Sequence, residues 1–493
     1  MSDLKRDGDV SLTQQLVDRF AAAIESGDLE PGEKLPTTRA LADQAGINHL
    51  TAARAYRRLA ELGYVTASVG RGTFVRAVTP ATAAEEGDDW QTYVLPDRPL
   101  SYREQVLDDA FRHAREPGVL SLATGWPSPS MYPIEELAEI TAAVFEEEGG
   151  EAISYLTAEG LFELREQLAR WVSDSGHPAD PDDIIVTSGA RQAIDLTARA
   201  LLEPGDVAVV ESPTFAGILS SARATGARII GVPVDEDGMN IDALEHVLAR
   251  HEVKLCALQT DCQNPTGVDL SAERRDRLAQ LAIERNFFVL EDRVYADLRF
   301  EGQGQPSVRS RAPGHVIYVN SLSKTVGGGL RLGWIVARGP VRERLAMLKL
   351  ETDFHSTTLA QHIAARFLAA GGHKRQIERS IPFYRERRDA LLESLARHMA
   401  GEYRAAVPRG GHHVWVTLNR PLDERDLYRE AARVGVSFTP GGAVTAERHS
   451  QTQLRLSFPL LDPDGLDEAV RRLARAIREV RRRHRHAATI PVS

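Results

Sequence analysis

Residues 321–334, SLSKTVGGGLRLGW, place Lys324 after two serines and before three glycines, and Arg331 follows seven residues later. The hydroxyls of Ser321 and Ser323 and the guanidinium of Arg331 can bind phosphate oxygens. A lysine beside a phosphate can form a Schiff base with an aldehyde. A nucleotide-binding loop is the alternative, but its GxxxxGK[ST] order is absent, because here the glycines follow the lysine. The stretch therefore predicts a site for a phosphorylated aldehyde.

The bulk composition is typical of a globular protein with more than one domain. The chain has 493 residues, of which 42% are hydrophobic and 26% charged, and its formal net charge is −10. No apolar run approaches the roughly 20 residues that cross a bilayer, and the start MSDLKRDGDV has no apolar signal segment. Cys256 and Cys262 are too few for a disulfide framework and too isolated for a metal site. We therefore expect a cytoplasmic protein without a membrane partner.

From about residue 119 to 480, strand-like apolar runs alternate with helical stretches. The runs are DIIVTSG, VAVVES, ARIIGVPV, KLCALQT, FFVLED and VIYVNS. Such alternation predicts an α/β architecture, a mostly parallel sheet with helices on both faces, whose ligands bind at the carboxyl ends of the strands. The residues that can carry chemistry fall there.

The run DIIVT is followed by a turn that favours an anion. Gly189 and the backbone amides of Ala190 and Arg191 open a helix there, and a helix N-terminus attracts a phosphate. The turn alone is a weak signal, since a plain strand-to-helix connection has the same composition.

Three further strands each end near a residue that suits an aromatic cofactor. Phe215 can offer a ring face, Asn264 in QNPTG can donate to an oxygen, and Asp292 is an acid that needs a positive charge if buried. Each alone has a structural alternative, such as a core phenylalanine. Together with Lys324 they describe a phosphate, an aldehyde, a stacked ring with a phenolic oxygen and a pyridinium nitrogen. That combination predicts pyridoxal 5'-phosphate.

Residues 119–480 resemble the fold-type I aminotransferases, especially the α-aminoadipate and kynurenine branch. The resemblance implies that Lys324 forms the Schiff base, that Asp292 keeps the pyridine nitrogen protonated, and that Phe215 stacks on the ring. It implies that Asn264 and Tyr295 hold the ring hydroxyl. The phosphate would be cradled by Gly189, Ala190, Arg191, Ser321, Ser323 and Arg331.

The same resemblance extends to the substrate side and to assembly. Arg455 in QLRLSF matches an arginine that grips an α-carboxylate, and Gly125 in TGWP matches a backbone contact to that group. Tyr155 matches a tyrosine that reaches the phosphate of a neighbouring subunit, which implies a homodimer. A smaller C-terminal α+β subdomain is implied as well. Taken alone, an arginine such as Arg455 is more often a sheet-edge salt-bridge partner.

The first 78 residues have a different pattern. Three short helical stretches precede YVTAS and TFVRA, two short strands joined by a tight turn, which is the pattern of a winged helix-turn-helix. The third helix has small and polar side chains at its start and arginines behind them, as needed for base edges and phosphates. A helical protein-interaction module is the alternative. The candidate contacts to double-stranded DNA are Arg39, His49, Thr51, Arg54, Arg57, Arg58 and Arg71.

This segment resembles the GntR-type winged helix almost from end to end. The turn before its recognition helix reads INHLTA, where that family commonly has a sequence such as VSRNTV. His49 therefore stands where arginine is common, and the operator sequence cannot be carried over from the family.

We expect three parts: a DNA-binding domain at residues 1–78, a flexible linker at 79–98 of roughly 25 Å, and a cofactor-binding and dimerisation domain at 99–493. The combination resembles the MocR/GabR-type transcription regulators. It implies a regulator that senses an amino acid, an amine or pyridoxal phosphate itself. An active aminotransferase with an accessory DNA-binding head is the alternative. Two departures bear on catalysis: Gly328 replaces a common proline, and Tyr295 follows Asp292 by three residues, as in true aminotransferases.

Overall fold

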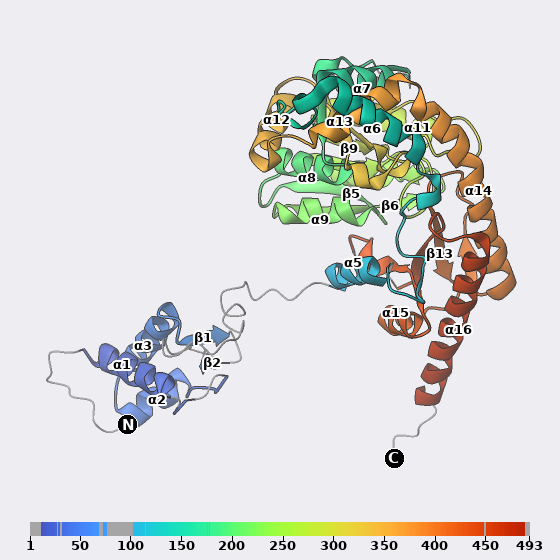
Figure 1. The fold of residues 1–493 in the computed structure, drawn as a ribbon. Helices are drawn as coiled ribbons and strands as arrows, with labels where there is room; N and C mark the ends of the chain where they lie inside the picture. The colour runs from blue at the N-terminus through green and yellow to red at the C-terminus, as the bar shows by residue number, and fades with distance from the viewer. Residues whose placement is uncertain are drawn as a thin grey trace. The chain divides into compact units, whose positions relative to one another are not determined.

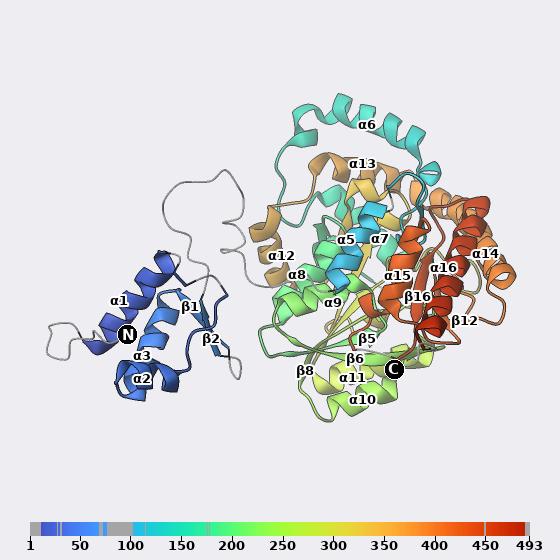
Figure 2. The ribbon, with the colours of Figure 1, turned by 90° about the horizontal axis from the view of Figure 1, so that it is seen from below.

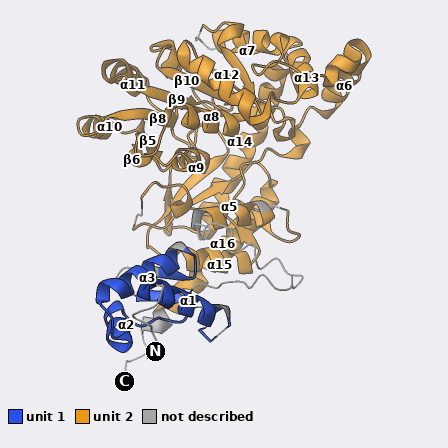
Figure 3. Ribbon diagram, turned by 90° about the vertical axis from the view of Figure 1, so that its left-hand side faces the viewer, with its two compact units in different colours: residues 1–99 blue, residues 100–493 orange. Residues whose placement is uncertain are grey.

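A computed structural model describes residues 11–488, except 27, 30–31, 69–71, 76–101, 114, 175, 177 and 448–449. The chain divides into two compact units, residues 1–99 and 100–493, which are coloured separately in Figure 3. The predicted linker, residues 79–98, and Arg71 lie outside the described residues.

The first unit contains three helices and a hairpin. The helices are α1 (Leu12–Glu25), α2 (Thr38–Ala45) and α3 (His49–Glu61), and β1 (Val65–Ser68) pairs antiparallel with β2 (Gly72–Val75). Each helix begins at a polar cap, because Ser11, Thr37 and Asn48 accept a hydrogen bond from a backbone amide of the first turn. Helix α2 is capped at its C-terminus by Gly46, whose φ of 63° lies in the left-handed region that favours a residue without a Cβ. The predicted winged helix is confirmed.

One face of each helix in this unit is buried in a common core. On α3 the buried residues Ala52, Ala55, Tyr56 and Leu59 recur at helical spacing. The opposite side of α3 is exposed, and it carries His49, Arg54, Arg57 and Arg58.

The second unit is built on an eight-stranded sheet in the order β4-β11-β10-β9-β8-β5-β6-β7 (Figures 1 and 2). Its strands are β4 (Ile184–Thr187), β5 (Val207–Ser212), β6 (Arg228–Asp235), β7 (Gly238–Met239), β8 (Val253–Gln259), β9 (Phe288–Asp292), β10 (Val316–Ser321) and β11 (Gly333–Val336). The parallel pairs β6-β5-β8-β9-β10 confirm the predicted architecture. Strand β11, which pairs antiparallel with both β10 and β4, was not predicted.

Helices cover both faces of this sheet, because neighbouring residues of a strand point to opposite sides. Val210 packs in the cluster with α8 (Ala190–Leu201), α9 (Ala216–Ala224) and α12 (Pro340–Asp353). Val209 packs in the cluster with α10 (Ile241–Leu248) and α11 (Ala272–Arg285). Beyond them, α7 (Phe162–Asp174) and α13 (Thr358–Ala369) pack on β4 and β11, and α6 (Ile134–Glu148) packs on α13.

The remaining elements form a smaller subdomain with its own core. Its four-stranded sheet has the order β12-β13-β16-β15, with β12 (Tyr403–Ala405), β13 (His413–Leu418), β15 (Thr439–Pro440) and β16 (Gln453–Ser457). It also has β3 (Leu120–Ser121) paired with β14 (Val436–Ser437), and the helices α5 (Tyr102–His113), α14 (Gly372–His398), α15 (Glu424–Arg433) and α16 (Pro463–Ala488). None of the helices in the described ranges is long and apolar enough to cross a membrane.

Gly333 at the start of β11 brings the predicted phosphate turn against the sheet. A Cβ at this position would lie 2.6 Å from the backbone nitrogen of Ala190 and 2.9 Å from the carbonyl oxygen of Asn320. Both are backbone atoms, so a side chain would force the turn away from the strand.

We expect Gly333→Ala to lower the free energy of unfolding by about 1–3 kcal/mol, as measured by denaturant titration. Gly329→Ala is the matched control, because no atom lies within 4 Å of its added Cβ. Equal effects of the two changes would contradict the close approach of β11 to the turn.

Candidate functional site

Lys324 lies in a short 3₁₀ turn, Leu322–Lys324, directly after β10. Its Nζ donates to the carbonyl oxygen of Gly125 at 3.0 Å and lies 5.7 Å from the ring centre of Tyr295. Burial, followed by the positive charge of Arg455, lowers the pKa of Lys324 to about 8. A lowered pKa increases the share of neutral amine, which is the nucleophilic form.

Asp292 ends β9, one strand away from the lysine turn. It is buried, and burial raises the pKa of its carboxyl to about 6. The amide of Val294 donates to its Oδ1 at 3.3 Å. No lysine or arginine among the described residues forms an ion pair with Asp292, so a positively charged ligand nitrogen would supply the missing charge.

Gln259 connects this acid to the asparagine loop and was not predicted. Its Nε2 donates to Oδ2 of Asp292 at 2.8 Å, and its Oε1 accepts from the amide of Asn264 at 2.9 Å. The backbone amide of Gln259 donates to the buried carboxyl of Glu211 at 2.9 Å. Burial raises the pKa of Glu211 to about 8. A signal for Gln259 in the sequence is that it is a polar residue at the end of an apolar run. That run forms β8, which pairs with β9 so that Gln259 lies beside Asp292.

Tyr295 is fully buried and forms a short relay with a histidine that the sequence did not assign. Its hydroxyl lies 3.0 Å from Nε2 of His413, and Nδ1 of His413 lies 2.9 Å from the hydroxyl of Ser457. Burial raises the pKa of Tyr295 and holds the pKa of His413 well below its ordinary value. The neighbouring His412 contacts the carbonyl of Gly125 at 3.3 Å instead.

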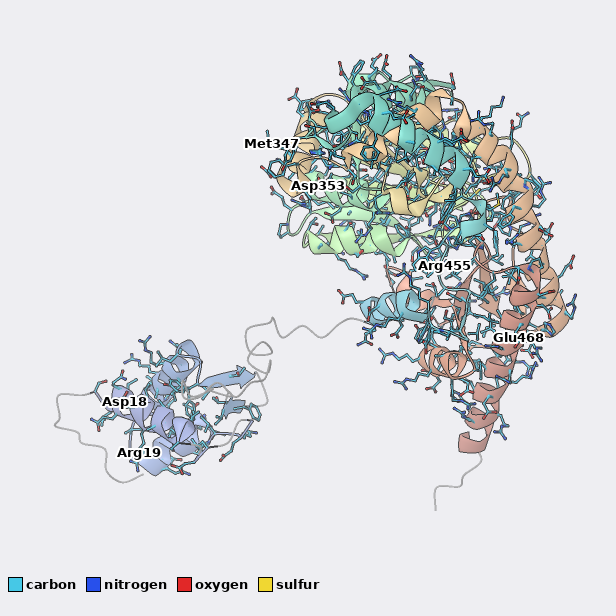
Figure 4. The ribbon with its side chains drawn as sticks, viewed as in Figure 1. Asp18, Arg19, Met347, Asp353, Arg455 and Glu468 are labelled. Carbon is cyan, nitrogen blue, oxygen red and sulfur yellow. The ribbon has the colours of Figure 1, made fainter. Side chains whose placement is uncertain are left out.

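Arg455 reaches the same space from β16 of the smaller subdomain, and Figure 4 labels it. It donates to Oδ1 of Asn264 at 3.0 Å, to Thr439 at 2.9 Å and to the carbonyl of Ala123. Its buried Nε has no hydrogen-bond partner among the described residues, and burial lowers the pKa of Arg455 to about 10. The guanidinium thus keeps donor capacity for an anion, and it makes no ion pair with a described carboxylate.

The predicted phosphate ligands converge at the N-terminus of α8. Gly189 is the N-cap of that helix, and a Cβ there would lie 2.7 Å from a guanidinium nitrogen of Arg331. Arg331 donates to the carbonyl of Ser188 at 2.7 Å. The hydroxyls of Ser321 and Ser323 lie 2.8 Å apart in the lysine turn.

Three predicted residues of the larger unit lie somewhat apart. The side chain of Arg191 points to α9, where it donates to the carbonyl of Gly217 at 2.6 Å, so only its backbone amide faces the turn. Phe215 is half-buried at the start of α9, with its ring over Gly217. Tyr155 is 86% exposed and contacts His355 at its edge, with 5.6 Å between ring centres.

The residues brought together fit pyridoxal phosphate. The helix N-terminus, two hydroxyls and Arg331 form an anion cradle that a side chain at position 189 would fill. A lysine of lowered pKa and a buried carboxylate without a cation partner lie at neighbouring strand ends. These are the donors that a phosphate, an aldehyde and a pyridinium nitrogen require.

In the first unit the structure places most of the predicted DNA contacts that it describes on one helix, α3. His49, Arg54, Arg57 and Arg58 are exposed on α3, and Thr51 is half-buried. Arg39 is exposed near the start of α2.

Both units match known families. Residues 119–473 match aminotransferase class I and II, and residues 12–75 match the bacterial regulatory proteins of the gntR family. The larger unit makes this chain a member of the class I and II aminotransferase family, and the fold and site define a pyridoxal-phosphate protein. Its N-terminal unit is a gntR-type DNA-binding domain, so the chain belongs among the MocR-type regulators.

Individual relatives agree with this assignment. The 2-aminoadipate transaminase of Thermus thermophilus is 35% identical over 397 residues, 77% of this chain and 98% of the relative. The probable rhizopine catabolism regulatory protein MocR of Rhizobium meliloti is 26% identical over 477 residues, 96% of this chain and 95% of the relative. The structure of Pyrococcus horikoshii kynurenine aminotransferase superposes with a TM-score of 0.74 at 32% identity, covering 80% of this chain and 98% of that one.

Asp292→Asn tests the cost of the buried carboxylate. The pKa of Asp292 is raised from 3.8 to about 6 in the folded protein. The folded state therefore binds more protons than the unfolded state between these pH values, and stability falls as pH rises through that window. The difference corresponds to about 3 kcal/mol above pH 6 and to nothing below pH 4.

We expect cofactor-free Asp292→Asn to be more stable than the wild type by about 2 kcal/mol at pH 8 and less stable by up to about 1 kcal/mol at pH 4. The change removes the cost of the buried charge only at the higher pH, whereas it loses some hydrogen bonding at both pH values. Urea unfolding at both pH values measures the difference. A stability difference that does not change with pH would exclude the raised pKa. The same change should weaken cofactor retention.

Proposed function

We propose that this chain is a pyridoxal-phosphate-dependent transcriptional regulator that binds operator DNA and senses an amino acid, an amine or pyridoxal phosphate itself. The observation that carries the proposal is the presence, in one chain, of a gntR-type winged helix and an aminotransferase class I and II domain. Relatives that span nearly the whole chain carry regulator names. We place the protein in the cytoplasm.

The roles of the site residues follow from their chemistry. When bound, the cofactor supplies an aldehyde that captures a primary amine and a ring that withdraws electrons. Lys324 offers the neutral amine, Asp292 holds a proton on the ring nitrogen, and Asn264 and Tyr295 orient the ring hydroxyl. Gly189, Ala190, the amide of Arg191, Ser321, Ser323 and Arg331 hold the phosphate, and Phe215 covers the ring.

Arg455 is the candidate recognition group for the effector. Its Nε, which has no hydrogen-bond partner among the described residues, supports binding of a carboxylate, and the backbone of Gly125 is the second proposed contact to that carboxylate. An effector regulates only if it binds two arrangements of the protein with different free energies.

We propose a homodimer in which Tyr155 reaches the phosphate of the second copy. Tyr155 is 86% exposed, Ile153 69% and Phe354 65%. This supports the proposal, since large apolar side chains are rarely left in water as a group. Two winged helices would then contact half-sites about 34 Å apart or a multiple of that spacing.

The presence of Lys324, Asp292 and Tyr295 together also favours a second candidate, a working aminotransferase. The two functions share their amine-capture step and differ in whether Lys324 moves the α-proton of the captured amino acid. Absorbance spectra of the holoprotein mixed with amino acids distinguish them. Accumulation of the aminated cofactor indicates transamination, whereas a stable shifted band indicates sensing.

We expect Lys324→Ala to lose the visible band of the cofactor-bound protein and its labelling by borohydride, and to retain cofactor more weakly through the phosphate cradle. Absorbance spectroscopy and peptide mapping after reduction provide the measurement. An intact band, or reduction at another lysine, would overturn the cofactor role of Lys324.

We expect Arg57→Ala to weaken operator binding with little sequence preference and to reduce the slope of log affinity against log salt by about 0.9, the value for one phosphate contact. Arg19→Ala is the matched control, since Arg19 is equally exposed but lies on α1 (Figure 4). Removal of residues 1–78 should abolish binding. An unchanged gel shift after that truncation refutes the DNA-binding role.

A further inference from the structure

Helix α16 carries a concentration of positive charge in a chain whose net charge is −10. Between positions 471 and 485 the only acidic residue is Glu479, and the arginines are Arg471, Arg472, Arg475, Arg478, Arg481, Arg482, Arg483 and Arg485. The winged helix and the cofactor site use none of them.

The helical spacing places part of this charge in one stripe. Positions 471, 475, 478 and 482 recur every three or four residues and therefore lie on one side of the helix. The other side, including Val470, Leu473, Ile477 and Val480, is buried in the core of the smaller subdomain. At 1.5 Å per residue the stripe is about 16 Å long. We call these four positions the arginine stripe.

The side chains in the middle of the arginine stripe have no partner among the described residues. Arg475 and Arg478 are exposed, and neither side chain makes a hydrogen bond or an ion pair there. Arg471 pairs with Glu468, which Figure 4 labels, and Arg482 pairs with Glu479 at 2.9 Å. Both pairs lie at the surface, where such pairs contribute little and can exchange for another anion.

Two ordinary explanations account for the stripe poorly. Cations near a helix C-terminus interact favourably with the helix dipole, but this effect is confined to the last turn, and the stripe begins at Arg471, more than four turns before Ala488. A solvated helix face normally mixes both signs of charge. Here the middle of the stripe has one sign only. Figure 1 shows this part of α16, in red, extending past α14.

We propose that the arginine stripe binds the phosphate backbone of DNA outside the base pairs contacted by the winged helix. Guanidinium groups bind phosphate oxygens in bidentate fashion, and a row of them about 5–6 Å apart along a helix suits a regularly charged polyanion. Contacts of this kind are sequence-independent and position a protein on the duplex. The inference rests on the proposed DNA-binding function.

The test compares the full-length, cofactor-bound wild type with the double variant Arg475→Gln/Arg478→Gln. The matched control is Arg250→Gln/Arg285→Gln, which removes two exposed arginines of the same unit that also lack a partner among the described residues. Affinity is measured over a range of salt concentrations on two duplexes. One contains only the operator, and the other adds flanking base pairs on both sides.

We expect the stripe variant to lose the extra affinity that flanking DNA gives, and its salt slope on the long duplex to fall by about 1.8, as for two phosphate contacts. Its affinity for the short duplex and the affinities of the control variant should stay unchanged. Equal affinities and slopes for the stripe variant and the wild type on the long duplex would overturn the inference and leave the regulator proposal intact. Failure of the wild type to bind either duplex would overturn both.

Discussion

The charge of Asp292 is the constraint on which the site depends. An ionised carboxylate in a buried position is costly unless a cation compensates it, and the described residues form no ion pair with it. Hydrogen bonds from Gln259 and Val294 reduce that cost without removing it. The protein thus keeps an unfavourable group in its interior, and in the proposed role of Asp292 a pyridinium nitrogen would supply the compensating charge. The parallel sheet places this group one strand from Lys324.

Much of this arrangement was predictable, because the chemistry lies at strand ends. Asp292, Asn264 and Lys324 each follow an apolar run, and parallel strands bring such positions to one edge. The predicted α/β architecture and winged helix are confirmed, and the cofactor is established by the family match. The roles of the individual site residues stay predictions, although the structure brings most of them together.

What the sequence did not provide depends on contacts between distant segments. Strand β11 is only four residues long, and its position between β4 and β10 is set by pairing, which periodicity does not reveal. Gln259 reads as an ordinary strand residue until its side chain is seen between Asp292 and Asn264. His412 and His413 are adjacent and both rings contact Tyr295, so only the structure shows that His413 makes the hydrogen bond to its hydroxyl.

The contact between Lys324 and Gly125 has a consequence for how the protein responds to acidity. The amine is held by a neutral carbonyl, and its pKa of about 8 lies close to physiological pH, as does the value of about 6 for Asp292. In the proposed roles, capturing an aldehyde would require the amine of Lys324 to lose its proton, whereas pairing with a ring nitrogen would hold Asp292 as an anion. Cofactor loading would then be coupled to proton exchange with the solvent, and its heat in a calorimeter would depend on the ionisation enthalpy of the buffer.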